Sequence, residues 1–293
     1  MTRFLDCRGT AALYFDWAAR EIAGMRKKPR LATVLFRPKE NPASLQYRDL
    51  IVKDAARLGI AVDGHEVDDE ESLISLVRKL NADRATTGQM LFYPLHCALK
   101  DEDVMDMVSP MKDVEGLHSM NLGYLIKFKR FLDEARAIKC VVPATAKAVV
   151  KILHTYPEIR IEGAFAVVIN NSMRVGKPLG LMLENLGATV MKCYDKTPRA
   201  LLEEEVRRAD LVVTAVPDPA FKLDPSWIKP GAVVVDVSYQ GNVDPAALQG
   251  VASFLTAPDN RIGVMTRAMT FINLIYCAKN VPLRRGPRVP VLG

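Results

Sequence analysis

Residues 164–195 combine a polar turn with an acidic strand end, a pairing that could hold a nucleotide. The apolar run AFAVVIN leads into the turn, and a helix is expected to begin at Lys177-Pro178. Backbone N–H groups and the helix dipole at such a start favour an anion such as a pyrophosphate. Asp195 ends a second apolar run, where a carboxylate can accept hydrogen bonds from a ribose diol and repel a 2′-phosphate. The segment predicts a dinucleotide site and favours NAD over NADP.

The glycine pattern that is usual for such turns is incomplete. G-x-G-x-x-G is absent, and only Gly176 remains in the turn. An α/β unit without those glycines is also typical of a generic doubly wound sheet. This segment alone therefore leaves open whether a nucleotide binds.

Parallel strands must bring the candidate residues together. Strands are predicted at about 164–170, 188–194, 211–216 and 232–237, each followed by a loop. Ligands of open parallel sheets bind above the carboxyl ends of the strands. The residues expected to bind the cofactor lie in those loops: Asn170, Asn171, Ser172, Arg174, Val175, Asp195, Val216, Pro217 and Ser238.

The first part of the chain repeats the alternation of strand and helix. RLATVLF, IAVDGHEV and QMLFYPL are predicted strands, and segments with helical apolar spacing separate them. The fold class is therefore α/β, with an N-terminal α/β domain and a C-terminal Rossmann-type parallel-sheet domain. The Pro/Gly-rich segment 283–293 is expected to be a flexible tail.

Composition narrows the functional classes. The 293 residues carry a net charge of +6 without a long Lys/Arg block. This charge suits a small polyanionic substrate at least as well as nucleic acid, and a soluble protein that is simply basic stays open; no nucleic-acid partner is expected. Five scattered cysteines, no apolar run of membrane-spanning length and no signal-peptide pattern predict a cytoplasmic protein without membrane contact. The four histidines share no metal-ligand spacing, so no metal site is expected.

Five collinear segments resemble the methylenetetrahydrofolate dehydrogenase/cyclohydrolase family: NPASLQY, YPL before an acidic helix, KDVEGLHSMNLG, SMRVGKPL and IKPGAVVVDV. The resemblance implies a folate-binding catalytic domain over residues 1–140 and an NAD-binding Rossmann domain over 141–264, with a cleft between them. It also implies a closing helix over 265–282 that packs back on the first domain, and a homodimer.

The resemblance further implies roles for single residues. Tyr47 is expected to stack on the folate aminobenzoate ring, and Glu115 of KDVEG to hydrogen-bond the pterin. These two are the candidate catalytic residues, while a half-buried packing tyrosine and a solvated turn acid stay open as alternatives. The residues expected to bind the folate substrate are Tyr47, Tyr93, Pro94, Leu95, Glu115, Arg261, Ile262 and Thr266.

One departure from the family pattern separates two activities. Bifunctional members carry a lysine one helical turn after the tyrosine, and this lysine drives cyclohydrolysis. Here that position is Ile51, and Lys53 lies about 200° further around the helix. The family's Gln-Leu-Pro is Phe92-Tyr93-Pro94, which removes the amide that positions the lysine.

Hydride transfer needs alignment, whereas hydrolysis also needs a titratable side chain. We therefore expect NAD-dependent oxidation of 5,10-methylene-tetrahydrofolate to 5,10-methenyl-tetrahydrofolate, with weak or absent cyclohydrolase activity. This pattern is similar to the monofunctional NAD-dependent methylenetetrahydrofolate dehydrogenases.

Two further substitutions bear on the cofactor and the reaction. The usual Gly-Arg-Ser of the turn is Asn170-Asn171-Ser172, so the arginine that would pair with a 2′-phosphate is Asn171. In the closing loop, Arg261 replaces a glycine and adds bulk and charge where close approach is usual. A non-redox folate-dependent one-carbon transferase and a folate/NAD-binding protein remain the alternative functions.

Overall fold

The computed structural model describes residues 1–259 and 261–280, which fold into two α/β units. The six-stranded unit consists of Met1–Trp17, Leu125–Phe128 and Val142–Met269. The three-stranded unit consists of Ala18–Tyr124, Lys129–Val141 and the chain from Thr270 onward. The predicted α/β class and two-domain architecture are confirmed. The tail predicted over 283–293 lies outside the described residues.

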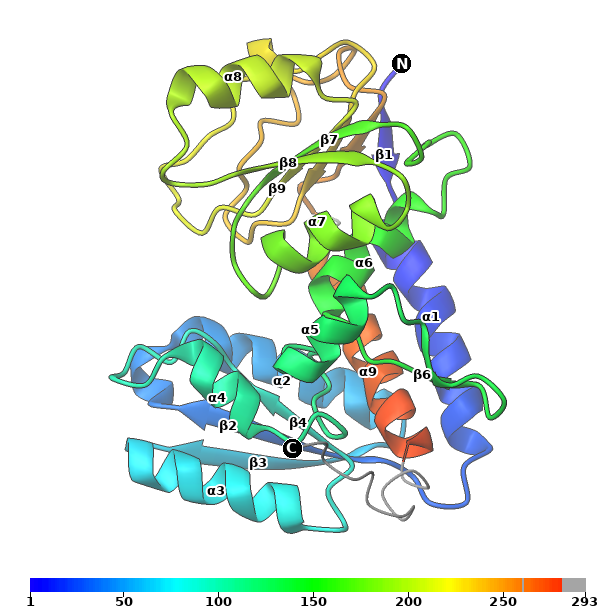
Figure 1. Ribbon diagram of the computed structural model, residues 1–293, viewed down its shortest axis with the longest axis vertical. Coiled ribbons are helices and arrows are strands. Elements are labelled where there is room, and N and C mark those ends of the chain that lie inside the picture. Colours follow the sequence, from blue (N-terminus) through cyan, green and yellow to red (C-terminus); the bar gives the residue numbers. More distant parts are fainter. Residues whose placement is uncertain (260, 281–293) are drawn as a thin grey trace. The chain divides into compact units, whose positions relative to one another are not determined.

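The strands of the larger sheet all run parallel, in the order β1-β11-β10-β9-β7-β8 (Figure 1). β7 is apolar throughout, and β9 and β10 are apolar up to their last residues, Thr214 and Asp236; all three are buried on both faces, as expected for parallel strands between two layers. All four strands predicted for this domain lie in the sheet. The strand bounds are Arg3–Leu5 for β1, Phe165–Ile169 for β7, Thr189–Cys193 for β8, Leu211–Thr214 for β9, Val233–Asp236 for β10 and Phe254–Thr256 for β11.

The strand β1 comes from the start of the chain. Arg3–Leu5 pairs residue by residue with Phe254–Thr256 of β11. The sequence-based boundary placed residues 1–140 together, but this pairing puts Met1–Trp17 in the six-stranded unit. Three residues are too few to show the alternation by which a strand is recognised.

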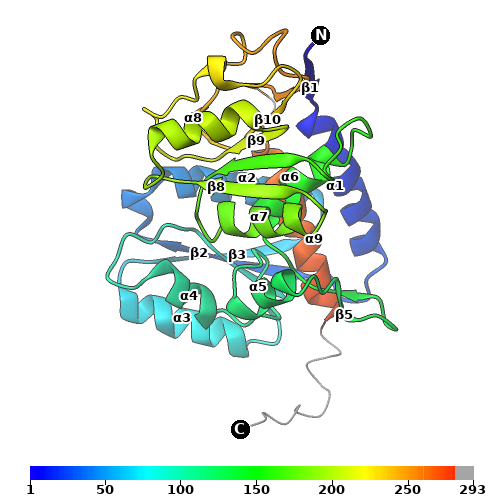
Figure 2. The same ribbon diagram turned by 45° about the horizontal axis from the view of Figure 1, so that its top comes forward.

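Helical segments cover both faces of this sheet (Figures 1 and 2). On one side lies α7 (Gly176–Glu184), which packs against α6 (Ala144–Leu153), and on the other side lies α8 (Arg199–Arg208). The order of β7, α7 and β8 is the predicted βαβ unit.

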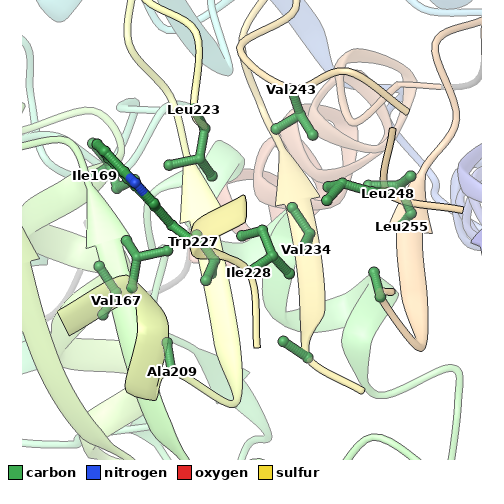
Figure 3. Close-up of a cluster of buried hydrophobic side chains, with 14 of the residues drawn as sticks. Val167, Ile169, Ala209, Leu223, Trp227, Ile228, Val234, Val243, Leu248 and Leu255 are labelled. Atoms are coloured by element: carbon green, nitrogen blue, oxygen red, sulfur yellow. The ribbon is translucent and has the colours of Figure 1, made fainter. Parts of the chain in front are cut away.

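A buried cluster on the α8 side holds the loops that follow the strands. Figure 3 shows Leu223 and Trp227, from the segment between β9 and β10, beside Val167 and Val234 of the sheet. Trp227 ends the short helix η2 (Pro225–Trp227). Since full burial of such a side chain contributes about 1.5–3 kcal/mol, these contacts fix the path of that loop.

The smaller sheet has the parallel order β3-β2-β4. Figure 2 shows α2 on one face of this sheet and α3 and α4 on the other. Asn41 begins α2 by accepting a hydrogen bond at Oδ1 from Ser44 N at 3.2 Å, with proline next in the chain. The bounds are Arg30–Phe36 for β2, Ala61–Val67 for β3, Gly88–Leu91 for β4, Pro38–Glu40 for η1, Pro42–Arg57 for α2, Glu70–Ala82 for α3, Asp101–Met107 for α4, Phe131–Asp133 for β5 and Ile138–Lys139 for β6.

Three helices contribute residues to both units: α1 (Cys7–Ala23), α5 (Ser119–Ile126) and α9 (Gly263–Lys279). Within the three-stranded unit, Asn273 of α9 donates from Nδ2 to the Val114 carbonyl oxygen at 2.8 Å. None of the helices in the described part of the chain has the length and hydropathy needed to cross a bilayer.

Candidate functional site

The chain reverses its direction of travel across the larger sheet between β7 and β9. From β7 it passes through α7 to β8 on one side, whereas β9, β10 and β11 extend to the other. Ligands of open parallel sheets bind at this point, outside the carboxyl ends of the strands. Asn170, Val216 and Ser238 follow β7, β9 and β10, so the structure brings these predicted cofactor residues to one edge.

The Asn170 side chain ties the ends of β7 and β9 together. Its Nδ2 donates to the Ala215 carbonyl oxygen at 2.8 Å, between the two strands. Its Oδ1 accepts hydrogen bonds from Ser172 N and Gly176 N, both at 2.9 Å, and from the Ser172 hydroxyl at 2.8 Å. One amide therefore fixes the strand end and the turn that leads into α7.

Gly176 allows the turn to close on the strand end. A β-carbon at this position would lie 1.9 Å from the Asn170 carbonyl oxygen, which is shorter than any real contact. Close backbone approach is one of the functions of the glycines in dinucleotide-binding turns. A single glycine supplies it here although the full pattern is absent.

The start of α7 offers fewer open donors than the sequence predicts. The N–H group of Lys177 donates to the Ser172 carbonyl oxygen at 3.1 Å, and Pro178 has no N–H group. Within residues 1–259 and 261–280, the N–H groups of Asn171 and Met173 have no acceptor. These two groups and the helix dipole are what the backbone of the turn offers to an anion.

Asp195 lies just beyond β8, in an exposed turn. Its side chain is 76% exposed and forms an ion pair with Lys196 at 3.1 Å. Because Ile169 pairs with Cys193 in the sheet, this carboxylate stands at the same edge as the Asn170 turn. It is accessible to a ribose diol that reaches the end of β8.

Asn242, which the sequence interpretation missed, holds the loop after β9. It is fully buried, and its Oδ1 accepts hydrogen bonds from Thr214 Oγ1 and Val216 N, both at 2.8 Å. Its Nδ2 donates to the Val216 carbonyl oxygen at 3.1 Å, so both polar groups of the Val216 backbone are paired. The sequence signal is a Gly-Asn pair, which predicts a turn but not the strand that the side chain reaches.

Asp236, at the end of β10, organises the next loop. Its buried carboxylate accepts hydrogen bonds from Asn242 N at 2.7 Å and from Ser238 N at 2.9 Å. The Ser238 hydroxyl donates to the same carboxylate at 2.6 Å and accepts from Gly241 N at 3.0 Å. This hydroxyl therefore stabilises its own loop.

A pocket of about 580 Å³ opens beside these loops. No residue of the turn 170–175 lines it. It is thus separate from the point where β7 and β9 meet. The segments after β9, β10 and β11 all contribute to its wall, including Lys222, Asp236, Gly241, Thr256 and Arg261.

In the three-stranded unit, Tyr47 and Ile51 lie one turn apart on α2. Tyr47 is half-buried, and its ring meets Phe92 edge-on with centroids 6.2 Å apart and planes at 79°. Ile51 is fully buried, whereas Lys53 is exposed. The structure therefore confirms that Lys53 lies on a different face from Ile51.

Glu115 follows a buried carboxylate in a tight turn. Asp113 accepts hydrogen bonds from Gly116 N and His118 N, both at 2.8 Å. Burial raises the pKa of Asp113 above its ordinary value, although these donors act in the opposite direction. The turn holds Glu115 half-buried.

A small void lies beside Glu115. It measures about 10 Å³ and is also lined by Gln89 and Tyr93. Gln89 Oε1 is buried and has no hydrogen-bond partner among the described residues. A void of this size accommodates one water molecule, which is the usual partner of such an acceptor. Of the neighbouring predicted folate residues, Leu95 is buried and Pro94 is exposed.

The other predicted folate residues belong to the six-stranded unit. Ile262 is fully buried, so neither its side chain nor its backbone is open to a ligand. Thr266 is half-buried and donates from Oγ1 to the Ile262 carbonyl oxygen at 3.4 Å. Arg261 is turned back onto carbonyl oxygens of its own unit.

The carboxyl edge of the larger sheet has what a dinucleotide requires. Gly176 gives close backbone approach, the turn has two open N–H groups, and Asp195 is accessible beyond β8. No group of three or more His, Cys, Asp or Glu side chains suited to a metal ion occurs in the part of the chain that the structure describes.

Comparison with protein-family models gives two adjacent matches. The NAD(P)-binding domain of tetrahydrofolate dehydrogenase/cyclohydrolase matches residues 143–281, and the catalytic domain of the same family matches residues 5–115.

Individual proteins agree with the family models. The bifunctional protein FolD of Leuconostoc citreum is 34% identical over 290 residues, which cover 96% of this chain and 99% of that protein. The structure of a 5,10-methylenetetrahydrofolate dehydrogenase from the silkworm Bombyx mori has a TM-score of 0.84 at 30% identity, covering 97% and 100% of the two chains. The NAD-dependent dehydrogenase of Saccharomyces cerevisiae has a TM-score of 0.88 at 24% identity, covering 97% and 99%, which shows the common fold.

Proposed function

The chain belongs to the tetrahydrofolate dehydrogenase/cyclohydrolase family, and from that membership we propose NAD-dependent oxidation of 5,10-methylene-tetrahydrofolate to 5,10-methenyl-tetrahydrofolate, with weak or absent cyclohydrolase activity. The observation that carries the proposal is Ile51, a fully buried apolar side chain one turn after Tyr47. It removes the group that hydrolysis needs and leaves the requirements of hydride transfer untouched.

The oxidation makes few demands on titratable side chains. NAD supplies the hydride acceptor, and a folate nitrogen lone pair assists departure of the hydride from the methylene carbon. The protein must align NAD with the methylene carbon of the folate and exclude competing reactions. We assign Tyr47 to stacking on the aminobenzoate ring and Glu115 to accepting hydrogen bonds from the pterin.

Hydrolysis requires a side chain that moves a proton while water adds to the methenyl carbon. Ile51 has no such group, and the exposed Lys53 lies on another face of α2. Phe92, buried beside Tyr47, has no amide with which to orient a lysine. These three residues support the loss of cyclohydrolase activity.

The preference for NAD rests on two positions of the larger sheet. Asp195 presents a carboxylate beyond β8, which suits a ribose diol and repels a 2′-phosphate. Asn171 stands where an arginine would pair with that phosphate, and its side chain is neutral. Both features favour NAD.

The test is a side-by-side assay with NAD and NADP that follows both the reduced nicotinamide and the methenyl chromophore. We expect reduction of NAD together with accumulating methenyl product, which active cyclohydrolase would remove. Absence of reduction with either cofactor would refute the proposal. Loss of methylene-folate without reduction would favour the one-carbon transferase, and NAD binding without folate binding would favour a binding protein.

We also propose that the protein acts as a homodimer, as the family resemblance implies. Light scattering during gel filtration should give twice the 32.5 kDa mass of the chain. A monomer mass at assay concentrations would contradict this.

A further inference from the structure

Arg261 joins the loops that follow two neighbouring strands. Its Nε donates to the Pro258 carbonyl oxygen at 2.8 Å, just after β11. Its Nη1 donates to two carbonyl oxygens just after β10. These belong to Tyr239 and to Ser238, and the distance to Ser238 is 3.3 Å. A planar guanidinium has donors on several sides, so one side chain can hold acceptors from both loops.

Two further cations bind main-chain carbonyls in the same region. Lys222, from the segment after β9, donates from Nζ to the Gly241 carbonyl oxygen. The Arg261 guanidinium lies against the same glycine, where an added β-carbon would stand 3.3 Å from Nη2. Arg8 of α1 donates to the Asp259 carbonyl oxygen at 2.5 Å. These cations thus connect the segments after β9, β10 and β11, in addition to the buried cluster and the Asn242 hydrogen bonds.

The loop after β10 has little apolar packing of its own. The side chain of Tyr239 is 81% exposed, and Gln240 beside it is also exposed. Exposed loops lose conformational entropy when a ligand orders them. The Arg261 contacts with this loop add to those of Asp236 and the Ser238 hydroxyl.

The position of the loop relates it to one end of the cofactor. A dinucleotide that meets Asp195 beyond β8 and the Asn170 turn after β7 extends past β9 toward β10. The loop from Ser238 to Gly241 would then face the nicotinamide end.

We infer that Arg261 is a positioning residue that holds the loop Ser238–Gly241 ready for the nicotinamide end of the dinucleotide, an inference that rests on the proposed function. Without its contacts, a smaller fraction of the protein molecules has this loop in the conformation that binds the cofactor. The apparent affinity for the cofactor falls in proportion to that fraction. The hydride step in molecules that have bound both partners is unchanged. The opposite role, an obstacle where the family has glycine, would give tighter binding once the side chain is removed.

The experiment compares Arg261→Gly, Arg261→Gln and Arg261→Lys with the wild type. We expect the first two to raise the KM for NAD about tenfold, with kcat and the KM for the folate within about twofold. The KM of Arg261→Lys for NAD should lie between that of these two variants and that of the wild type, because one ammonium reaches only some of the carbonyl oxygens. Arg160→Gln is the matched control, since Arg160 is exposed in the same unit and has no partner among the described residues.

Hydrogen exchange of the ligand-free protein gives an independent readout. Peptides covering Ser238–Gly241 should exchange faster in Arg261→Gly, while those covering Asn170–Gly176 should not. Lys222→Gln removes only the hydrogen bond to the Gly241 carbonyl oxygen. Exchange in Ser238–Gly241 should therefore rise less in this variant than in Arg261→Gly.

Unchanged exchange in this loop, or a KM for NAD that stays the same or falls, would overturn the inference. A fall in kcat alone would instead indicate direct contact with the reacting groups. If the wild type reduces neither cofactor, the proposed function fails, and the exchange experiment still decides whether Arg261 orders the loop.

Discussion

Asn170 and Gly176 are joined by a hydrogen bond of 2.9 Å from Gly176 N to Asn170 Oδ1, and their backbones approach so closely that a β-carbon on Gly176 would overlap the Asn170 carbonyl oxygen. The turn between them lies directly before α7. Its geometry therefore depends on the absence of one methyl group.

Gly176→Ala should displace this turn. We expect destabilisation of about 1–3 kcal/mol, because the close contact forces the backbone apart, and at least about tenfold weaker NAD binding. Calorimetric titration and thermal unfolding measure the two effects. Gly123→Ala is the control, since a β-carbon at Gly123 meets nothing within 4 Å. Unaltered NAD binding in Gly176→Ala would show that the turn does not shape the site.

Asp195→Ser should shift cofactor preference. Removing the carboxylate takes away a hydrogen-bond acceptor for the ribose and a repulsive charge for a 2′-phosphate, so the ratio of kcat/KM for NAD to that for NADP should fall about tenfold. Glu204→Ser changes another exposed acid of the same unit and should leave the ratio as it is. An unchanged ratio for Asp195→Ser would remove its assigned role.

Ile51→Lys should destabilise the protein without restoring hydrolysis by itself. The position is fully buried, and burial of an ammonium costs about 2–5 kcal/mol in unfolding free energy at neutral pH. Burial lowers the pKa of a lysine, so the unfolded state binds more protons and stability should recover as pH rises toward about 10.

Val52→Lys provides the comparison for that substitution. Val52 lies next to Ile51 on α2 but is 41% exposed, so the same lysine should cost little there. Urea unfolding at several pH values measures both variants. Equal losses would mean that position 51 accommodates a charge as readily as the exposed position 52, contrary to its burial.

Asp210 should contribute to the acid sensitivity of the larger sheet. Hydrogen bonds from Lys229 and from Phe165 N lower the pKa of this carboxyl. Its contribution is therefore complete above the ordinary value of about 4 and is lost as pH falls through the lowered folded value. It should amount to less than about 1 kcal/mol, because the side chain is 45% exposed.

Urea unfolding of the wild type and Asp210→Asn between about pH 3 and 7 tests this. The difference in unfolding free energy should shrink toward the acid end. Lys229→Gln in the wild-type background should flatten the same slope, since Lys229 is the main cause of the shift. A difference that grows on acidification would contradict the assignment.

The sequence predicted the parts of the fold that depend on local pattern. The strands β7, β9 and β10 are apolar runs, the last two up to their final residue. Helical geometry predicted that Lys53 lies on a different face of α2 from Ile51. The sequence located the turn that contains Gly176. It did not predict the Asn170 hydrogen bonds that hold this turn, because they form only when the chain folds back on the end of β7.

Other features depend on tertiary contacts that no local pattern carries. Asn242 reaches Thr214 from a neighbouring loop, so its amide could only be recognised once the sheet was known. Arg261 was expected at the substrate because the family resemblance places it in the loop that closes over the pterin, and its guanidinium lies on carbonyl oxygens of its own unit. Spacing alone does not determine the direction in which a long side chain turns.

The edge strand β1 has a consequence for synthesis on the ribosome. Among the described strands it pairs only with β11, and Thr2 donates to the Ala252 carbonyl oxygen 250 residues away. Residues 3–5 must therefore remain unpaired until residues 254–256, about 250 positions later in the chain, have emerged. Chaperone binding to nascent chains would be expected to persist up to that length, and to end once the late strand becomes available.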